Sequence, residues 1–144
     1  MSARMVEIER LVDAPPDRVY RMWADPDSVN QWLAYQVRGS LLPGARSELV
    51  FPRSHIAIDV LEAEPDSRFK LRWLHGEVPE LVTEVTITIR PQGWGSLVSV
   101  ADGPYDTDEE MILEEYARAI AIWSAALAQL RAMVDFSIDL RKER

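Results

Sequence analysis

The side chains of this sequence best suited to move a proton or bind a metal are two histidines, because there is no cysteine. His75 continues the alternation of Leu71 and Trp73 along one predicted strand, so it should point to the same apolar face. His55 has the opposite parity to the apolar residues of its own strand and should face outward or lie in a turn. The two rings are not expected to meet, and we predict neither a metal site nor a bound cofactor.

Aromatic residues are abundant, with five tryptophans among 144 residues. Four of them fall on predicted inward faces, where they either build the core or line an apolar pocket that carries few polar groups. The fifth, Trp94, lies in a Gly-Trp-Gly turn and should be exposed or pack at an edge. We predict a ligand-binding set that consists of Trp23, Trp32, Trp73, His75, Tyr116, Ile120 and Trp123.

A few further polar side chains are expected near that pocket. Arg10 lies on the inward parity of the first predicted strand, and a buried arginine needs a partner, which would be Asp13, Glu62 or a ligand carboxylate. Tyr116 offers a hydroxyl at the edge of the pocket, and Glu62, at the end of its strand, is a further polar candidate there. None of these groups has the spacing of a nucleophile and its base, so no catalytic residue is assigned.

Alternation of apolar and polar residues, interrupted by proline and glycine, predicts the elements that position these side chains. Strands are expected over residues 6–12, 46–51, 55–64, 69–75, 81–90 and 95–101. Two short helices, residues 17–24 and 26–33, should follow the first strand and break at Asp25-Pro26, where Asp25 would cap the second helix; residues 34–45 should form a loop. Short turns between successive strands predict an antiparallel meander.

The last element should be one long helix. Thr107 and Glu110 have the spacing of a capping box, and the helix should run from there to about Val134. Its main apolar stripe comprises Leu113, Tyr116, Ala117, Ile120, Trp123, Leu127, Leu130 and Val134. A second, weaker stripe of Ile122, Ala126, Gln129 and Met133 could pair two chains, which makes a homodimer a further hypothesis. The main stripe should pack on the meander, giving an α+β fold.

Several motifs occur in a recognisable order: Val6-Glu7-Ile8-Glu9-Arg10, Asp13-Ala14-Pro15-Pro16, Val19-Tyr20-Arg21-Met22-Trp23, Asp25-Pro26, Gln31-Trp32-Leu33, Pro43-Gly44 and Trp123-Ser124-Ala125-Ala126-Leu127 with Leu130. They resemble the START-like (SRPBCC) superfamily, and most of all the branch similar to the activator of heat-shock-protein-90 ATPase. Two positions depart from that branch: Ala45 replaces the second glycine of a pair, and Ile122 replaces a glycine before Trp123. The resemblance implies a helix-grip fold with a cavity between the curved sheet and the long helix.

Composition and charge restrict the classes of partner. The net charge is −8 and no basic stripe is present, which argues against nucleic-acid binding. No apolar run approaches the roughly 20 residues that span a bilayer, and the charged N-terminus is unlike a signal peptide, so cytoplasm is the expected location. We expect residues 1–144 to form a single domain with its core over about 5–134, followed by a helix extension or tail at 135–144.

Seven acidic residues and no basic residue lie between Asp102 and Glu115. They are either a docking surface for a basic partner or a solvated helix N-terminus, where acidic side chains are favourable.

The leading hypothesis is a binding module without catalysis that holds a small apolar or aromatic ligand between the sheet and the long helix. The first alternative, implied by the resemblance, is an enzyme of the cyclase, aromatase or hydrolase kind that uses His75 or Tyr116 to move a proton. The second alternative is a protein-interaction domain like a co-chaperone, with a chaperone as its partner. A real cavity is needed by the first two hypotheses and not by the third.

Overall fold

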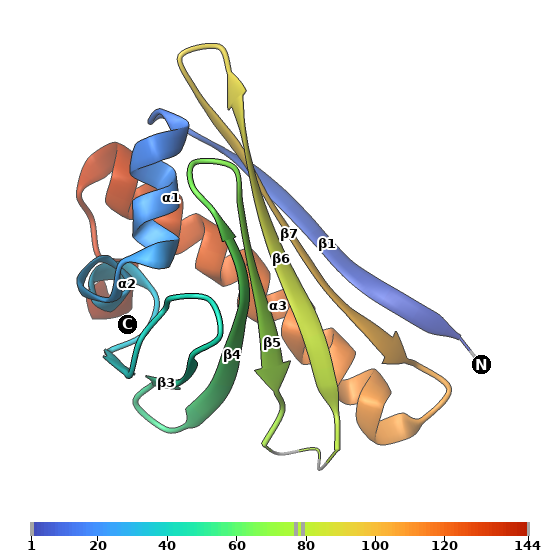
Figure 1. Ribbon diagram of the computed structural model, residues 1–144. Coiled ribbons are helices and arrows are strands. Elements are labelled where there is room, and N and C mark those ends of the chain that lie inside the picture. The colour runs from blue at the N-terminus through green and yellow to red at the C-terminus, as the bar shows by residue number, and fades with distance from the viewer. Residues whose placement is uncertain (1, 77, 79, 144) are drawn as a thin grey trace.

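Seven strands form one antiparallel, curved sheet in the computed structural model, which describes residues 2–76, 78 and 80–143. The strands are β1 (Ala3–Val12), β2 (Gln36–Arg38), β3 (Arg46–Val50), β4 (His55–Glu64), β5 (Arg68–Leu74), β6 (Val82–Gln92) and β7 (Gly95–Asp106). From β2 to β7 each strand lies beside the next one in the chain, and β1 pairs with β7. Register shifts in β1 and β4 add local bends to the sheet, whose curvature is visible in Figure 1.

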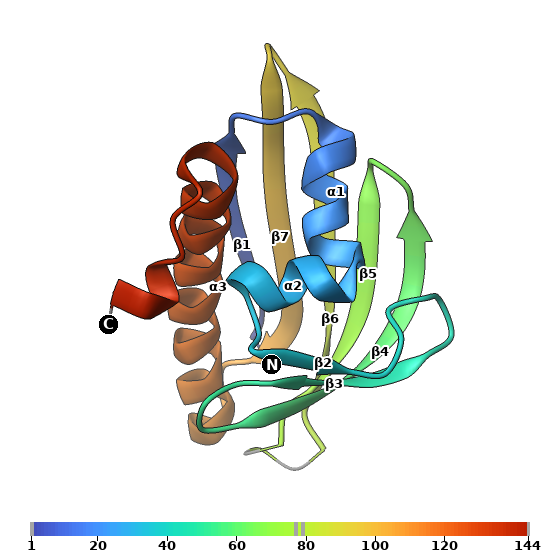
Figure 2. The same cartoon turned by 90° about the vertical axis from the view of Figure 1, so that its left-hand side faces the viewer.

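Three α-helices and a short 3₁₀ helix complete the described fold. They are α1 (Pro16–Ala24), α2 (Pro26–Trp32), α3 (Glu110–Phe136) and η1 (Leu140–Glu143). The long helix packs against β1 and β7, while α1 packs on β5 and β6 and α2 bridges α3 and β2. Figure 2 shows α1 and α2 beside α3 on the same face of the sheet. This α+β helix-grip arrangement confirms the fold predicted from the sequence.

The two short helices begin where proline favours a helical start, and they break at Asp25-Pro26 as predicted. The expected cap of α2 by the side chain of Asp25 is wrong in detail. Its carboxylate accepts a hydrogen bond from the Ser28 hydroxyl at 2.8 Å and makes no bond to a backbone amide of the helix. Helix α2 therefore starts with a proline, whose fixed backbone angle suits the first helical position, and it has no side-chain cap.

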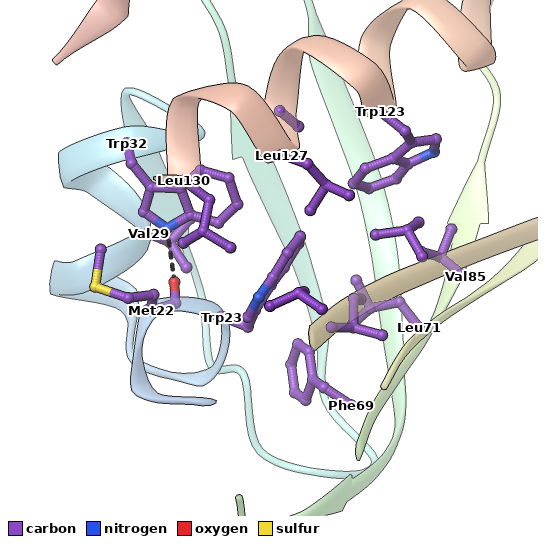
Figure 3. Packing of buried hydrophobic residues seen from close by; sticks show 14 of the residues in the cluster. Met22, Trp23, Val29, Trp32, Phe69, Leu71, Val85, Trp123, Leu127 and Leu130 are labelled. Atoms are coloured by element: carbon purple, nitrogen blue, oxygen red, sulfur yellow. Dashed lines mark hydrogen bonds between the residues drawn. The ribbon is translucent and has the colours of Figure 1, made fainter. Parts of the chain in front are cut away.

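Aromatic and aliphatic side chains from every layer meet in the core shown in Figure 3. Trp23 and Trp32 contact each other edge to face, with ring centroids 4.8 Å apart. The indole N–H of Trp32 donates to the backbone carbonyl of Met22 at 2.8 Å, so this fully buried ring has its polar atom satisfied. Leu127 and Leu130 of α3 close the same cluster against the short helices.

Several boundaries differ from the sequence prediction. Residues Gln36–Arg38, expected in a loop, form the short strand β2 on β3, and both β1 and β7 are longer than predicted. The capping box is also wrong: α3 begins at Glu110 without a side-chain cap, because the Thr107 hydroxyl donates to the backbone carbonyl of Ser2 instead. The helix ends at Phe136, and the next residue, Ser137, adopts the left-handed conformation with φ 56°.

The phase of the N-terminal half of α3 differs from the predicted stripe. Leu113 and Ile120 are exposed, whereas Glu115 and Ala119 face the sheet and are buried. Each residue along an α-helix turns the side chain by about 100°, so the face toward the sheet carries a charged and a small side chain where the prediction placed large apolar ones.

The second predicted stripe of α3 lies mostly inside the protein. Ala126 and Gln129 are buried, Met133 is half-buried and only Ile122 is exposed. Gln129 donates a side-chain hydrogen bond to the carbonyl of Trp32 at 3.0 Å, which ties α3 to α2. The sequence argument for a homodimer through this stripe therefore does not hold.

By length and composition α3 also meets the minimum for a membrane span, contrary to the sequence estimate, but core helices of globular proteins meet it equally.

Candidate functional site

A cavity of about 390 Å³ lies between the N-terminal half of α3 and the adjoining end of the sheet. Its walls come from α3, from the connection between β3 and β4, and from β4, β5 and β7. The lining residues are Phe51, Ser54, His55, Ile56, Trp73, His75, Gly76, Asp102, Glu115, Arg118, Ala119, Ile122 and Trp123. A volume of this size, mostly apolar with a few polar groups, is typical of sites for small molecules.

A histidine and a glutamate that lie 40 residues apart form the first part of the polar wall. Nδ1 of His75 lies 2.9 Å from Oε2 of Glu115, and both side chains are buried. Because a carboxylate only accepts hydrogen bonds, Nδ1 is the nitrogen that donates. The other oxygen of Glu115 accepts a hydrogen bond from the guanidinium of Arg118, one turn along α3, so the charge of this carboxylate is compensated.

Two hydroxyls continue the network on the far side of the imidazole. Nε2 of His75 lies 2.9 Å from the Thr83 hydroxyl, and the Tyr105 hydroxyl lies 3.5 Å from the same nitrogen. Tyr105 is completely buried and donates to Oδ2 of Asp102 at 2.7 Å. Burial, and secondly the negative charge of Asp102, raises the pKa of Tyr105 well above its usual value, which keeps this hydroxyl a donor.

Asp102 ends the network at the buried side of the cavity. It comes from β7 and is only 1% exposed. Its Oδ2 atom accepts a second hydrogen bond, from the indole N–H of Trp123 at 2.9 Å. Its Oδ1 atom has no hydrogen-bond partner among the residues that the structure describes. The site therefore contains two different carboxylates. Glu115 is paired with the cation Arg118, and Asp102 receives hydrogen bonds only from neutral donors among the described residues.

Three of the seven predicted ligand-binding residues, Trp73, His75 and Trp123, line the cavity. The rings of the two tryptophans meet at an interplanar angle of 66° and a centroid distance of 5.2 Å. Trp23 and Trp32 lie in the core of Figure 3, with Trp32 on the opposite side of the cluster from Trp123.

Two other predicted ligand residues lie outside the cavity lining. Tyr116 is half-buried against the ring of Tyr105, with centroids 5.5 Å apart. Ile120 is 39% exposed, because of the shifted phase of α3. Of the other polar candidates, Glu62 pairs with Arg68 at 3.0 Å, and Arg10 does not line the cavity.

Sequence reasoning missed Asp102 and Glu115 as site residues and placed them in an acidic run that was either a docking surface or a solvated helix N-terminus. Both are buried in the cavity wall, so that description fails for these two members of the run. One signal was present: Asp102 has the parity of the buried Val98 and Val100, which marks it as an inward acid. His55 is exposed as predicted and pairs with Glu48 at 3.4 Å, but its side chain also contributes to the cavity rim.

Metal ligands are not clustered in the part of the chain that the structure describes. Within it, no group of three or more histidine, aspartate or glutamate side chains is placed to hold an ion. The arrangement of the cavity wall can accept or donate hydrogen bonds to an organic molecule, and its aromatic walls can contact an apolar body.

The fold has close counterparts among solved structures. The solution structure of the Aha1 dimer from Colwellia psychrerythraea has a TM-score of 0.81 at 15% identity and covers 92% of this chain and 97% of that chain. CalU16 from Micromonospora echinospora has a TM-score of 0.72 at 26% identity, covering 92% of this chain and 74% of that one. DynU16, described as a putative protein in the dynemicin biosynthetic locus, has a TM-score of 0.79 at 23% identity. That match covers 92% of this chain and 48% of DynU16.

Sequence comparison gives the family directly. None of the curated proteins compared with this chain matches it. A family model described as Activator of Hsp90 ATPase homolog 1-like protein matches residues 13–135, which include every strand except β1 and nearly all of α3. The fold and the order of the motifs agree with that match, and the chain therefore belongs to the family of Activator of Hsp90 ATPase homolog 1-like proteins.

Proposed function

We propose that this chain is a small-molecule-binding module that holds an apolar or aromatic ligand between the sheet and α3. The observation that carries the proposal is the cavity of about 390 Å³, which has Trp73 and Trp123 in its wall and a buried polar network behind them. Apolar walls supply affinity by burying ligand surface, and a few fixed polar groups select orientation. The place of the similar DynU16 in a biosynthetic locus agrees with a small molecule as the ligand.

Binding is favoured over catalysis by the way the polar groups are engaged. Both ring nitrogens of His75 already lie at 2.9 Å from protein partners, Glu115 and Thr83, so neither is free to exchange a proton with a ligand. Tyr116, the other candidate for proton transfer, lies outside the cavity lining. An enzyme that used either residue as its acid or base would need a rearrangement of this wall.

The direct test is to fill the cavity from α3. Ala119 lines it and is buried, so Ala119→Phe places an aromatic ring where the ligand would lie. Titration with a neutral aromatic probe, methylnaphthalene, followed by ligand-observed NMR, should show saturable binding to the wild type. Binding to the variant should weaken by at least about tenfold, because the volume is occupied.

The matched control is Ala121→Phe, which adds the same ring to the exposed side of the same helix. It should bind the probe like the wild type. Equal binding to wild type and Ala119→Phe, or no binding to either protein, would refute the proposed site. Native mass spectrometry of gently purified protein, compared with denatured protein, would in addition reveal a ligand retained from the cell.

A second candidate function is that of a co-chaperone, which rests on the family description alone. Its test is independent of the cavity: the protein should raise the ATPase rate of an Hsp90 in a coupled assay. The cavity-filling variant Ala119→Phe should then be as active as the wild type, because a chaperone would contact the outer surface. No change in ATPase rate over a wide range of protein concentration would exclude this function.

A further inference from the structure

One carboxylate in the cavity wall lacks the partners that a buried charge requires. Asp102 is 1% exposed, and its Oδ2 atom receives two hydrogen bonds, from Tyr105 and Trp123. Its Oδ1 atom receives none among the described residues, although an ionised carboxylate has lone pairs on both oxygens. Leaving a buried acceptor unpaired is costly, so a native structure that does so usually has a reason at that site.

The charge balance of the site points the same way. Glu115, the other buried acid, forms an ion pair with Arg118 and accepts a hydrogen bond from Nδ1 of His75. No ion pair to Asp102 is found among the residues that the structure describes, and both groups bonded to its Oδ2 atom are neutral. Burying a carboxylate without a counter-charge is unfavourable, and a cation placed beside it would remove that penalty.

The wall next to Asp102 suits a cation for a second reason. Trp123, whose N–H bonds to the carboxylate, lies beside Trp73, and both indoles line the cavity. Faces of tryptophan rings attract cations through their quadrupole, and their apolar surface also packs on a hydrocarbon body. The same short stretch of wall therefore offers an acceptor, an unbalanced negative charge and aromatic surface.

We propose that the cavity selects ligands that carry a protonated amine on an aromatic or aliphatic body, with the ammonium group donating to Oδ1 of Asp102. The inference rests on the proposed function, since it names the class of molecule that the same cavity takes. The body of the ligand lies against Trp73 and Trp123, and the amine reaches the buried end of the cavity.

Three probes with one body separate charge from hydrogen bonding: methylnaphthalene, naphthylmethanol and naphthylmethylamine. Isothermal titration at neutral pH should give the amine an affinity for the wild type at least about tenfold above that of methylnaphthalene, because a buried charge-assisted hydrogen bond is added. Asp102→Asn keeps the shape and removes the charge, so it should abolish the preference for the amine while the affinity for methylnaphthalene changes less than about threefold.

The control is Glu114→Gln, which removes one acidic charge from the exposed side of α3 close to the same end of the sheet. It should leave the order of the three probes unchanged. A readout on the wild type covers the case in which Asp102→Asn does not fold: a nuclear Overhauser contact should join the ligand methylene beside the amine to the indole N–H proton of Trp123.

The outcomes separate this inference from the proposed function. Tighter binding of methylnaphthalene than of the amine would overturn the inference and leave a binding module for neutral ligands. Equal affinity of the alcohol and the amine would also overturn it, because the charge would then play no part. A missing contact between the bound amine and Trp123 would overturn it as well. Failure of all three probes to bind would refute the proposed function, and the inference with it.

Discussion

Removal of a single hydroxyl tests the polar network most sharply. Tyr105→Phe deletes the group that donates to Asp102 at 2.7 Å and leaves the packing of a fully buried ring in place. A hydrogen bond to a charged group contributes about 1.5–3 kcal/mol, and its loss also leaves the carboxylate with one donor instead of two. We therefore expect a loss of about 2 kcal/mol in the free energy of unfolding, and for 144 residues a melting temperature lower by about 4–8 °C.

The assay is urea unfolding followed by tryptophan fluorescence, with the slope of the transition compared between proteins. Tyr116→Phe is the matched control, because that ring packs on Tyr105 and its hydroxyl has no hydrogen bond among the described residues. The control should lie within about 0.5 kcal/mol of the wild type. In an Asp102→Asn background the loss caused by Tyr105→Phe should fall to about 1 kcal/mol, because the acceptor is then neutral.

The same variant makes a prediction about alkaline pH. Burial, followed by the charge of Asp102, raises the pKa of Tyr105 in the folded state above its usual value of 10.0. A raised folded-state pKa means that the contribution to stability is complete below the unfolded-state value and is lost as the pH rises through the folded-state value. Above about pH 10 the wild type should thus lose stability more steeply than Tyr105→Phe. Equal stability of Tyr105→Phe, Tyr116→Phe and the wild type, with parallel alkaline limbs, would refute the reasoning.

Three further predictions concern the frame that holds the site. The hydrogen bond from Arg46 lowers the pKa of Asp59 below its usual value of 3.8. The contribution of Asp59 to stability is therefore complete above pH 3.8 and is lost as the pH falls through the lower folded-state pKa. Asp59→Asn should accordingly flatten the fall in the free energy of unfolding between about pH 6 and pH 2. A methyl group on Gly95 would lie 2.3 Å from the carbonyl of Val12, so Gly95→Ala should destabilise by about 2 kcal/mol or more in urea. Arg141 donates to two carbonyls at the end of α2, so Arg141→Ala should raise limited proteolysis after α3 by about tenfold.

Each of these variants has a matched control. Glu7→Gln removes an exposed acid from β1 and should leave the acid limb unchanged. Gly76→Ala meets no atom within 4 Å and should be nearly neutral, so equal losses at both glycines would show that the close approach at Gly95 is not the cause. Arg131→Ala removes a partly exposed ion pair on α3 and should leave proteolysis almost unchanged. A rise in proteolysis as large as that of Arg141→Ala would remove the special role of the tail contact.

Most of the fold was predictable, because strand parity and turn residues carry it. The buried side chains of β6, Val85, Ile87 and Ile89, alternate with polar ones, so the face of that strand followed from its sequence. Trp94, in the turn after that strand, is 97% exposed, in line with its position between two glycines. The short strand β2 escaped prediction because only three residues form it and its pairing with β3 supplies the order that its sequence lacks.

The polar half of the site was not predictable in the same way. Strand parity was enough to place His75 on the inward face. Its partner Glu115 lies 40 residues away in the sequence, on a helix whose buried face was predicted wrongly from its larger apolar side chains. Hydrophobicity ranks Leu113 and Ile120 as buried, whereas Glu115 is buried because two other residues satisfy its oxygens. Pairing of this kind depends on tertiary contacts, which the local pattern does not contain.

The location of the cavity follows from how the helices divide the face of the sheet. The short helices α1 and α2 reach only one part of it, and there Trp23, Trp32 and the C-terminal half of α3 fill the space (Figures 2 and 3). The N-terminal half of α3 presents Glu115 and Ala119 to the sheet, and these are too polar and too small to complete an apolar core. Replacing a buried ionic network by well-packed apolar residues often leaves stability unchanged or raises it, so stability alone gives little reason for such a wall. The core at one end thus supports the fold, and the other end is left to polar groups and open volume, which is the division that the proposed binding module requires.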